Sequence, residues 1–457
     1  MDDPTRFWLA QDGDARIEIA AETGTNPYGC PPYPDPELLD FGSATASVIS
    51  EAGYAAADRL RRSLGCTGKE PPATSRLLRE TERIREELLV LLGIPPAAGI
   101  AALLTASGTD AIRLASMLVW NESERPPDIL AVAPEESGRG VPDALSAPSG
   151  GRYCPIRVRD PRGRLRPPGE VREETLAAAA RAHAEGRPLF VILTDVSKTG
   201  LVVPGLPLLE SIRQHAQAPL RVLVDACQLR LSSHSLNAYL TQGFMVALTG
   251  SKFLGGPSFS GALLVPRHFP GRLASVSTAP LPLGQLLRWE AALAELRRFS
   301  TLQSTDIRTF LDRFSAAVTA HMDGSAQLER LETLPPDRAP FGSDDDWDRV
   351  QTIFPFLLHR PAGQGGGPLT AEETMAVFRS LPRGGPDAHR SVPRSRLGQP
   401  VGCGVRGNRP VSALRLCVSA RHAVSAVEGG AAQQRRIMAQ ACATLDAAAR
   451  LAAELRE

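Results

Sequence analysis

The sequence contains very little lysine. Of its 51 basic residues only Lys69, Lys198 and Lys252 are lysines, and the others are arginines. Such an arginine excess is most often a compositional bias of the genome and indicates no function by itself. The shortage still narrows the search, because an amine is the side-chain nucleophile that forms imines with carbonyl compounds. If the chemistry needs such an amine, three side chains can supply it.

The chain also lacks an excess of charge of either sign, and its formal net charge is +1 at pH 7. A balanced charge gives no electrostatic footprint for nucleic acid or for an anionic membrane surface. No apolar run approaches the roughly 20 residues that cross a bilayer. The N-terminal sequence MDDPTRFWLAQDGDARIEIA has scattered charges and no apolar signal-peptide core. We therefore expect a cytoplasmic protein with small-molecule partners, no nucleic acid and no membrane.

Cysteine is sparse and widely spaced. The seven cysteines form no CxxC pair and no Cys/His ligand pattern, and they stand at positions 30, 66, 154, 227, 403, 417 and 442. An odd number without such motifs is typical of free thiols in a reducing compartment. We expect no metal site.

Short, nearly continuous apolar runs alternate with helical patterns from about residue 71 onward. The pattern predicts a helix over 74–92 and strands over 101–107, 128–133, 153–158, 188–196, 221–226, 244–250 and 261–266. A half-exposed antiparallel sheet would alternate apolar and polar residues, whereas these runs do not. The fold class that follows is α/β, with a seven-stranded, mostly parallel sheet covered by helices on both faces.

We expect three regions, because 457 residues with 43% hydrophobic content exceed one ordinary core. Residues 1–70 are too rich in proline for a core element and should wrap over the active site. Residues 71–310 form the large α/β domain. Residues 311–457, with a strand over 352–359 and Gly/Pro-rich loops, form a smaller C-terminal α+β domain.

Small residues follow the first predicted strand, at the start of a helix. In an open parallel sheet, ligands bind beyond the carboxyl ends of the strands. Ser107, Gly108 and Thr109 stand at such an end, where backbone N–H groups and hydroxyls can bind a phosphate. Ordinary helix capping is the alternative interpretation for these residues.

The strand over 221–226 ends with Asp225, and Gln228 follows three residues later. A buried carboxylate beside a pyridine nitrogen keeps that nitrogen protonated and makes the ring an electron sink. Gln228 can donate a hydrogen bond to a phenolic oxygen of the same ring. The alternative is that Asp225 caps the next helix.

Thr249, Ser251 and Lys252 lie in a glycine-rich bend between two apolar strands. Burying an ammonium is costly unless it is paired or its pKa falls, and a desolvated amine with a lowered pKa is what imine formation requires. The neighbouring hydroxyls suit a phosphate. The alternative is a lysine at a solvated turn.

These segments follow a specific order: the small-residue turn, then Asp-x-x-Gln, then Ser-Lys with Lys252 27 residues after Asp225. The combination resembles fold type I enzymes that use pyridoxal 5′-phosphate (PLP), the aspartate aminotransferase superfamily. Its spelling, with SKFLGGPSFSGALLV, is similar to the class V aminotransferase and cysteine desulfurase branch. The resemblance spans roughly residues 70–310. It implies a homodimer in which Lys252 holds PLP as a Schiff base in the large domain.

Two positions depart from the pattern of that branch. Ser197 and Lys198 stand where relatives have an asparagine near the ring, so we expect Ser197 to contact the cofactor and Lys198 to be the rival for the imine. Lys252 is preferred because its spacing and glycine-rich context both fit. Glu136 or Ser137 stands where relatives place a histidine or aromatic ring. Taken alone, either is better interpreted as part of a solvated loop.

The resemblance also implies an arginine that binds the substrate α-carboxylate, through the bidentate fork that lysine lacks. Arg415 occupies that position, with Arg421 as the substitute. A partner-subunit contribution to phosphate binding could come from Thr278 or from residues 298–305, and nothing in the sequence decides between them. Residues 402–407 match G-x-G-x-x-G but precede a predicted strand, so we assign them no nucleotide role.

The reaction implied is one on an amino acid or amino-acid conjugate, through an external aldimine. We favour lyase chemistry in specialised metabolism, by C–S cleavage, β-elimination or decarboxylation, because the usual aminotransferase signals are missing. An aminotransferase is the alternative, and a non-catalytic PLP-fold binding protein is a remote one. A cysteine desulfurase would need a reactive cysteine on a late loop, for which Cys403 is the candidate, since Cys417 lies in a predicted strand.

Overall fold

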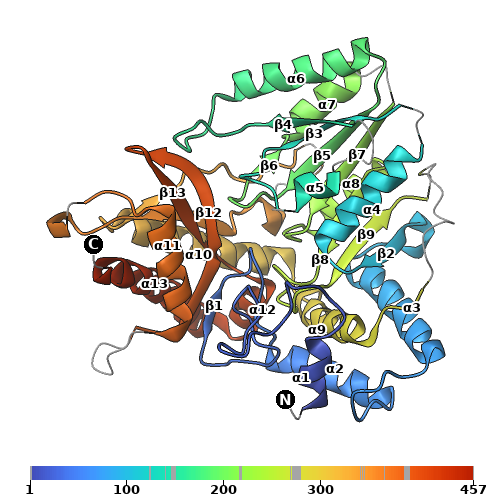
Figure 1. Ribbon diagram of the computed structural model, residues 1–457, viewed down its shortest axis with the longest axis horizontal. Coiled ribbons are helices and arrows are strands. Elements are labelled where there is room, and N and C mark those ends of the chain that lie inside the picture. Colours follow the sequence, from blue (N-terminus) through green and yellow to red (C-terminus); the bar gives the residue numbers. More distant parts are fainter. Residues whose placement is uncertain are drawn as a thin grey trace.

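The computed structural model describes residues 3–122, 125–138, 140–145, 151–215, 219–267, 269, 279–339, 341, 343, 345–364, 366–384 and 392–455. Two sheets, each packed against helices, make up the described part of the chain (Figure 1).

The larger sheet contains all seven predicted strands. Their order across the sheet is β2 (Ala101–Thr105), β9 (Gly261–Val265), β8 (Met245–Thr249), β7 (Leu220–Ala226), β5 (Leu189–Asp195), β3 (Asp128–Val132) and β4 (Arg152–Ile156). β9 is antiparallel to β2 and to β8, and the other neighbouring pairs in this order are parallel. The prediction of a mostly parallel α/β sheet is therefore confirmed. A two-residue strand that we did not predict, β6 (Val202–Val203), pairs antiparallel with β5.

Alternate side chains of each central strand are buried on opposite faces of the larger sheet, which explains the nearly continuous apolar runs. In β5, Phe190 and Ile192 pack in the same cluster as α4 (Gly108–Trp120) and α5 (Val141–Leu145). Val191 and Leu193 belong to the cluster on the other face. That cluster contains residues of α6 (Pro168–Ala184), α7 (Leu206–His215) and α8 (Ser233–Thr241).

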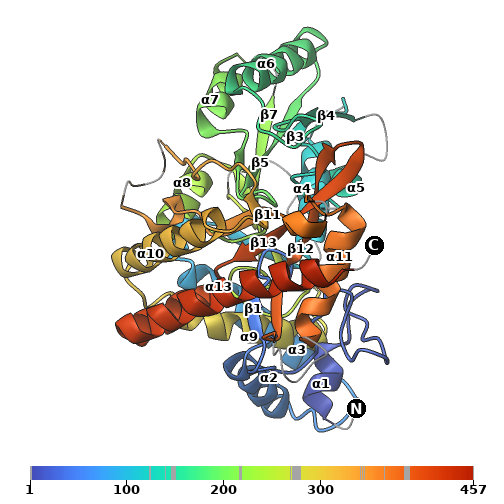
Figure 2. The same ribbon diagram turned by 90° about the vertical axis from the view of Figure 1, so that its left-hand side faces the viewer.

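The smaller sheet draws strands from both ends of the chain. Its order is β1 (Leu39–Phe41), β12 (Ser395–Arg406), β13 (Arg409–Cys417), β11 (Ile353–Leu358) and β10 (Leu328–Arg330). The helices of this part are α10 (Ser304–Asp323), α11 (Ala371–Ser380), α12 (Ala420–Glu428) and α13 (Gly430–Glu454). The long helix α13 runs across one side of the molecule (Figure 2).

The expectation that the proline-rich N-terminal residues form no core element is wrong. β1 pairs in parallel with β12, and Phe41 at its end is 1% exposed. After α1 (Pro4–Leu9), helix α2 (Glu51–Ser63) packs against α9 (Leu283–Phe299). The prolines cluster between these elements, at 27–36, so they interrupt the segment without excluding structure on either side. Helix α3 (Thr74–Leu91) follows as predicted.

The Gly/Pro-rich stretch 381–400 and the segment 401–407 around Cys403 were expected to be loops, whereas residues 395–406 form β12. Its pairing with β13 shifts register between Gly398 and Val401 and again between Gly402 and Val405. Irregularities of this kind break the strict alternation by which a strand is identified in a sequence. The strand is therefore hidden by its bulges and by its glycines and Pro400.

Candidate active site

A cavity of about 510 Å³ lies at the carboxyl ends of the large-sheet strands. The predicted residues Ser107, Gly108, Thr109, Asp225, Gln228, Thr249, Ser251, Lys252 and Arg415 all line it, and among the predicted contacts only Ser197 does not. Residues of the smaller sheet and of the N-terminal segment complete the walls. One hollow thus brings together residues as far apart in the chain as Arg16 and Arg415.

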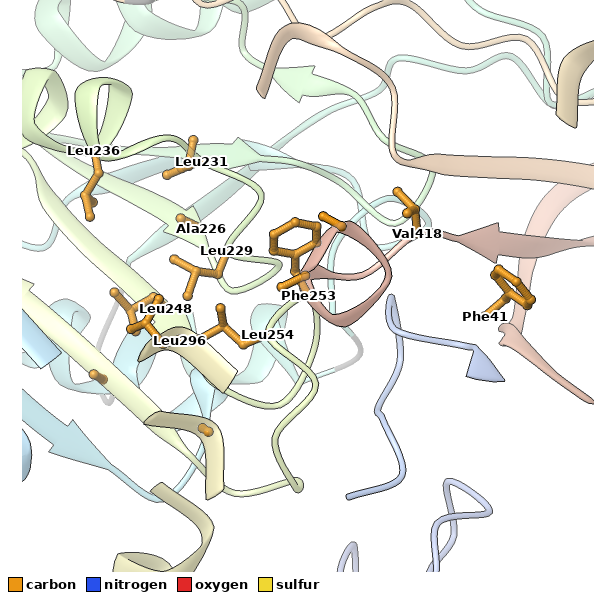
Figure 3. Packing of buried hydrophobic residues seen from close by; sticks show 14 of the residues in the cluster. Phe41, Ala226, Leu229, Leu231, Leu236, Leu248, Phe253, Leu254, Leu296 and Val418 are labelled. Carbon is orange, nitrogen blue, oxygen red and sulfur yellow. The ribbon is translucent and has the colours of Figure 1, made fainter. Parts of the chain in front are cut away.

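Lys252 follows β8, and hydrophobic packing fixes the bend that carries it. The next two residues, Phe253 and Leu254, are 1% and 2% exposed and pack with apolar residues of the loop after β7 (Figure 3). The Phe253 ring also stacks on Trp347, with 5.2 Å between ring centroids. A bend anchored by buried rings holds the lysine backbone at the cavity wall. The Lys252 carbonyl accepts a hydrogen bond from Ser47 Oγ at 3.2 Å.

The three lysines have different surroundings. Among the described residues, none forms a hydrogen bond or an ion pair with the Lys252 amine. Lys198 also lines the cavity, but its Nζ donates to the carbonyl of Pro134 at 3.0 Å. Lys69 lies outside the cavity lining and sits over the ring of Phe7. These contacts favour Lys252 over its rival as the reactive amine.

Asp225 is the last residue but one of β7; it is 7% exposed and lines the cavity. Its Oδ1 accepts a hydrogen bond from the backbone N–H of Cys227 at 3.2 Å. Burial raises the pKa of the Cys227 thiol, the Asp225 charge raises it further, and the Lys252 charge lowers it, so both charges lie near that thiol. Ser232 caps the following helix, α8, so the alternative role of Asp225 as its cap is excluded.

Gln228 leaves a buried polar atom without a partner. Its Nε2 donates to the carbonyl of Ala44 at 3.1 Å, whereas Oε1 has no hydrogen-bond partner among the described residues. Buried amide oxygens in folded proteins nearly always have partners. Because Gln228 lines the cavity, the open position is suited to a group bound there.

Hydroxyl groups and one glycine gather at the N-terminus of α4. Ser107 caps this helix, and its Oγ donates to Asp110 Oδ2 at 2.7 Å. A Cβ on Gly108 would lie 2.5 Å from Cys227 Sγ and 2.9 Å from Thr249 Cγ2, so the close packing requires glycine. Ser251 Oγ donates to Thr249 Oγ1 at 3.3 Å. The arrangement places hydroxyls beside the positive end of a helix, which favours an anion.

Glu136 and Ser137 are each 2% exposed and line the cavity, so their interpretation as part of a solvated loop is wrong. Glu136 Oε1 pairs with Arg159 Nε at 2.7 Å, and Oε2 accepts from Ser197 Oγ at 2.7 Å. Thr199 Oγ1 donates to the same carboxylate at 2.8 Å. Ser197 lies outside the cavity lining because its hydroxyl is held by Glu136.

Arg415 on β13 is a buried guanidinium whose partners are all neutral. Its Nη2 donates to the carbonyl of Gln399 at 2.7 Å and to Thr45 Oγ1 at 2.9 Å. Within the described residues no carboxylate pairs with it, and burial lowers the pKa of its guanidinium. Arg421, the alternative candidate for this role, does not line the cavity, and its Nη2 lies 3.7 Å from Asp40 Oδ2. Arg415 is thus the better placed of the two for a ligand carboxylate.

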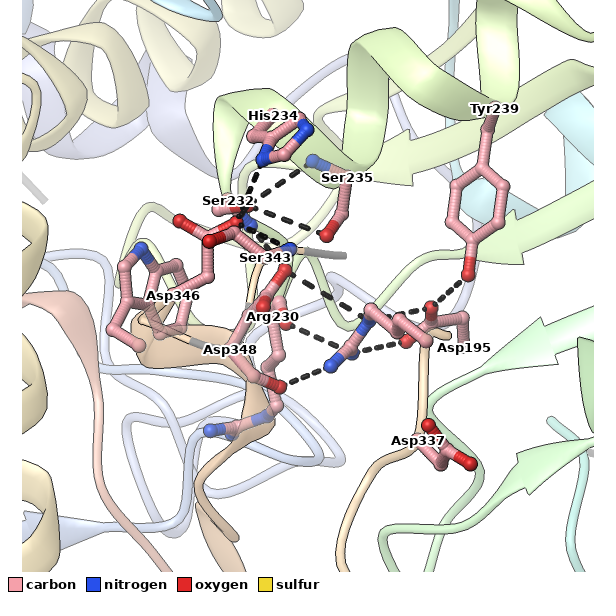
Figure 4. Close-up of polar contacts among 12 residues, drawn as sticks. Asp195, Arg230, Ser232, His234, Ser235, Tyr239, Asp337, Ser343, Asp346 and Asp348 are labelled. Carbon is pink, nitrogen blue, oxygen red and sulfur yellow. Dashed lines mark hydrogen bonds and ion pairs between the residues drawn. The ribbon is translucent and has the colours of Figure 1, made fainter. Parts of the chain in front are cut away.

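A buried polar cluster lies just outside the cavity, at the end of β5. Arg338 Nε donates to Asp195 Oδ2 at 2.9 Å. Tyr239 Oη donates to the same oxygen at 2.8 Å (Figure 4). The Arg338 and Asp195 side chains are both 0% exposed. The next residue along the chain, Val196, lines the cavity. The cluster therefore fixes the strand end that contributes to the site.

The sequence missed several cavity residues. Arg16, Tyr28 and Thr45 come from the N-terminal segment, and Gln399 comes from β12. None of these residues belongs to a motif, so only the tertiary structure reveals them. The expectation that the N-terminal segment wraps the site was the one available signal.

Some candidate residues lie elsewhere. Thr278 falls outside the described residues. Phe299, Ser300, Leu302 and Ser304, from the 298–305 segment, line a separate hollow of about 420 Å³. Residues 402–406 lie in β12 and lead into a hairpin, so the G-x-G-x-x-G match is not a strand-to-helix turn.

Cys403 was proposed as a loop cysteine, and that expectation is wrong. It lies in β12, is 4% exposed, and burial raises the pKa of its thiol to about 11. A buried thiol with a raised pKa is a poor nucleophile.

The part of the chain that the structure describes contains no group of three or more His, Cys, Asp or Glu side chains that could hold a metal ion. None of the described helices has the length and apolar character needed to span a bilayer.

The chain matches no protein-family model and no curated protein sequence. Solved structures do match. A NifS-like protein has a TM-score of 0.58 and 10% identity, over 90% of this chain and 99% of that one. The cystine C-S lyase C-DES, in complex with its reaction product cysteine persulfide, has a TM-score of 0.55 and 15% identity, over 89% and 97%. A serine palmitoyltransferase from S. paucimobilis with a bound PLP–myriocin aldimine has 0.53 and 14%, over 90% and 88%. The chain therefore has the fold type I architecture of PLP enzymes that its sequence predicted.

Proposed function

We propose that the chain is a PLP-dependent enzyme that acts on an amino acid or an amino-acid conjugate, with Lys252 holding the cofactor. One observation carries the proposal. In a chain with three lysines, Lys252 lines the same cavity as the buried Asp225, and its amine has no hydrogen-bond partner among the described residues. The PLP–myriocin aldimine in the serine palmitoyltransferase structure of similar fold supports PLP as the cofactor.

The residues present fit the cofactor. The unpartnered Oε1 of Gln228 marks a position for a polar ring substituent, and the cradle at Gly108 excludes any side chain. The hydroxyls of Thr249 and Ser251, with the α4 N-terminus, suit a phosphate. Asp225 is the buried carboxylate that a protonated pyridine nitrogen requires.

Each side chain then has a defined task. Lys252 would hold the cofactor through an imine with its aldehyde and, once released, would move the proton at the substrate Cα. When bound, the cofactor ring accepts the charge left by breaking a bond at Cα. Arg415 would bind the α-carboxylate and so orient the substrate.

We propose lyase chemistry in specialised metabolism, by C–S cleavage, β-elimination or decarboxylation. The cystine C-S lyase of similar fold supports this choice over an aminotransferase. Desulfuration that depends on a cysteine nucleophile is disfavoured at Cys403, because that thiol is buried in β12 and its pKa is raised to about 11.

Spectroscopy tests the cofactor assignment. The purified chain supplied with PLP should be yellow, and borohydride should abolish the long-wavelength absorbance. Lys252→Ala should remove the imine band, whereas Lys198→Ala should retain it. A colourless protein that does not respond to added PLP would contradict the proposal. A yellow protein that turns over no amine would instead identify the non-catalytic binding protein.

Product analysis tests the reaction type. The loaded enzyme is mixed with amino acids and with cysteine S-conjugates. Pyruvate with ammonia would support elimination, and carbon dioxide with an amine would support decarboxylation. Accumulation of the pyridoxamine form with release of a 2-oxo acid would identify an aminotransferase and overturn the lyase proposal.

Three further expectations remain proposals. The homodimer is supported by the resemblance on which it was predicted, and light scattering of the loaded protein tests it. A cytoplasmic location is supported by seven cysteines that are all unpaired. The division of the chain at about residues 70 and 310 stays a prediction, which limited proteolysis with mass mapping can examine.

A further inference from the structure

Arg16 is a cavity residue that the proposed function leaves without a task. Four cationic side chains line the cavity: Arg16, Lys198, Lys252 and Arg415. Lys252 has the imine role, Lys198 is bonded to Pro134, and Arg415 lies on the smaller sheet. Arg16 comes from the N-terminal segment and is partly buried.

Contacts place Arg16 on the wall beside the α4 N-terminus. The Arg16 guanidinium carbon lies 4.7 Å from the ring centroid of Phe259, which also lines the cavity. Two residues after Phe259, the backbone of Gly261 touches Ser107, so that a Cβ on Gly261 would lie 2.4 Å from the Ser107 carbonyl carbon. Ser107 is the cap of α4. Arg16 is therefore stacked on the segment that adjoins the cap.

The backbone before Arg16 is anchored to α9. Arg288 donates to the carbonyls of Gln11 and Asp12 at 2.6 and 2.9 Å. The backbone N–H of Gly284 donates to Asp12 Oδ2 at 2.8 Å. Arg16 is thus presented by a fixed turn.

The Arg16 guanidinium has more N–H donors than it uses in binding Asp14. Its Nε and Nη2 donate to Asp14 at 2.9 and 2.7 Å. Its Nη1 donates to no residue that the structure describes. Hydrogen bonding to Asp14 raises the pKa of Arg16, and the charge of Asp110, at the start of α4, contributes in the same direction. Arg16 thus stays charged and lies within reach of the field at the α4 N-terminus.

A phosphate bound beside the α4 N-terminus needs a nearby cation. The groups that suit a phosphate there, Thr249, Ser251 and the α4 N-terminus, are formally neutral, and the carboxylate of Asp110 adds a negative charge. A phosphate monoester carries about −1.5 to −2 charge at neutral pH. Arginine N–H groups match phosphate oxygens in geometry as well as in charge.

We propose that Arg16 is a phosphate-binding residue for the cofactor, donating a charge-assisted hydrogen bond through Nη1 while its Nε and Nη2 stay paired with Asp14. The proposal rests on the proposed function, since it assumes that PLP is the group held by Lys252. It assigns part of the phosphate site to the N-terminal segment of the same chain.

The test compares PLP with pyridoxal, which has the aldehyde and the ring but no phosphate. Apoprotein is titrated with each compound, and the imine absorbance gives the dissociation constant. Arg16→Gln should weaken PLP binding about 10- to 100-fold, as expected for one charge-assisted hydrogen bond, and should change pyridoxal binding less than about twofold. Arg16→Lys should recover part of the loss. The matched control is Arg62→Gln, whose side chain is 71% exposed on α2 and which should change neither constant.

The ratio of the two constants within one variant cancels a general folding defect. Equal weakening of PLP and pyridoxal by Arg16→Gln would overturn the phosphate role, and so would unchanged PLP binding. Inorganic phosphate provides a second measure. Its inhibition constant against PLP binding should be higher for Arg16→Gln than for the wild type. A wild-type chain that binds neither compound would overturn the proposed function itself, which separates the two failures.

Discussion

At the scale of single residues, the cavity is defined by buried and partly buried polar side chains. Lys252, Asp225 and Gln228 were identified because burying an amine, a carboxylate or an amide between apolar strands needs a reason, and such outliers are visible in a sequence. Glu136 was misjudged because its partner, Arg159, lies 23 residues away and nothing local indicates the pair. Arg16 was missed because one arginine among many gives no signal.

Arg415 offers a residue-scale prediction about substrate binding. Arg415→Lys keeps the charge but loses the planar fork that matches a carboxylate. We expect KM for an α-amino acid to rise at least about tenfold, corresponding to the loss of about 1.4 kcal/mol of binding. Steady-state kinetics on the loaded enzyme measure it. Arg421→Lys is the control, and an equal rise in KM there would refute the choice of Arg415.

His422 offers a residue-scale prediction about pH. The pKa of this side chain is lowered from 6.5 to about 4, mainly by burial; Arg421 and Arg230 contribute to the lowering and Asp40 opposes it. Because the folded pKa lies below the unfolded one, the unfolded chain binds the proton first. Stability should fall as pH drops below 6.5 and level off near 4, by up to about 3 kcal/mol.

Denaturant unfolding of the wild type and His422→Gln across pH 4–7 measures this effect. Glutamine can replace the imidazole in the capping box with Ser419, so the helix cap is retained. The variant should show a smaller decline in unfolding free energy toward pH 4. Parallel pH profiles for the two proteins would show that His422 does not carry the effect.

At the scale of elements, strands with plain apolar character were predicted, and those with irregular pairing were not. The seven strands of the larger sheet are recognisable because both of their faces are buried, so each is a continuous apolar run. β12 contains two register shifts and was assigned to a loop. β1 has three residues and depends on its parallel partner for its existence.

The loop after β4 packs closely against β12 of the smaller sheet. Gly163 has φ +76°, and a Cβ there would lie 1.9 Å from the carbonyl oxygen of Cys403 in β12. Gly163→Ala should separate the loop from β12 and lower the unfolding free energy by about 1–3 kcal/mol. Gly169, where a Cβ would meet nothing within 4 Å, supplies the control variant Gly169→Ala. Thermal melts compare them, and equal melting temperatures would contradict this packing.

At the scale of the whole molecule, the chain joins distant segments through buried polar contacts as well as through its core. Arg338 pairs with Asp195 on β5 and donates to the carbonyl of Arg230 at 3.2 Å (Figure 4). Sequence patterns report helices and strands, but they do not report which distant residues meet. The shape of the cavity and the residue contacts across it could therefore not be predicted from the sequence, whereas the fold type could.

Arg338→Met tests how much the Arg338–Asp195 cluster contributes to the free energy of unfolding. The substitution leaves the Asp195 carboxylate buried without its cation, and removing one partner of a buried pair costs about 3–5 kcal/mol. We expect a lower denaturation midpoint and, because Val196 lines the cavity, weaker PLP binding. The exposed pair Arg330 and Asp323 provides the control, since Arg330→Met should change stability by less than about 1 kcal/mol. Similar losses in both variants would contradict a special role for Arg338.

Lys252 is the residue on which the proposed cofactor chemistry depends most. The direct measurement is to load the chain with PLP, reduce it with borohydride, digest it and locate the pyridoxyl group by mass spectrometry. If Lys252 holds the cofactor, the pyridoxyl label should lie on the peptide that contains Lys252, in wild type and in Lys198→Ala alike. A label on Lys198 or Lys69, or a chain that takes up no label, would contradict it.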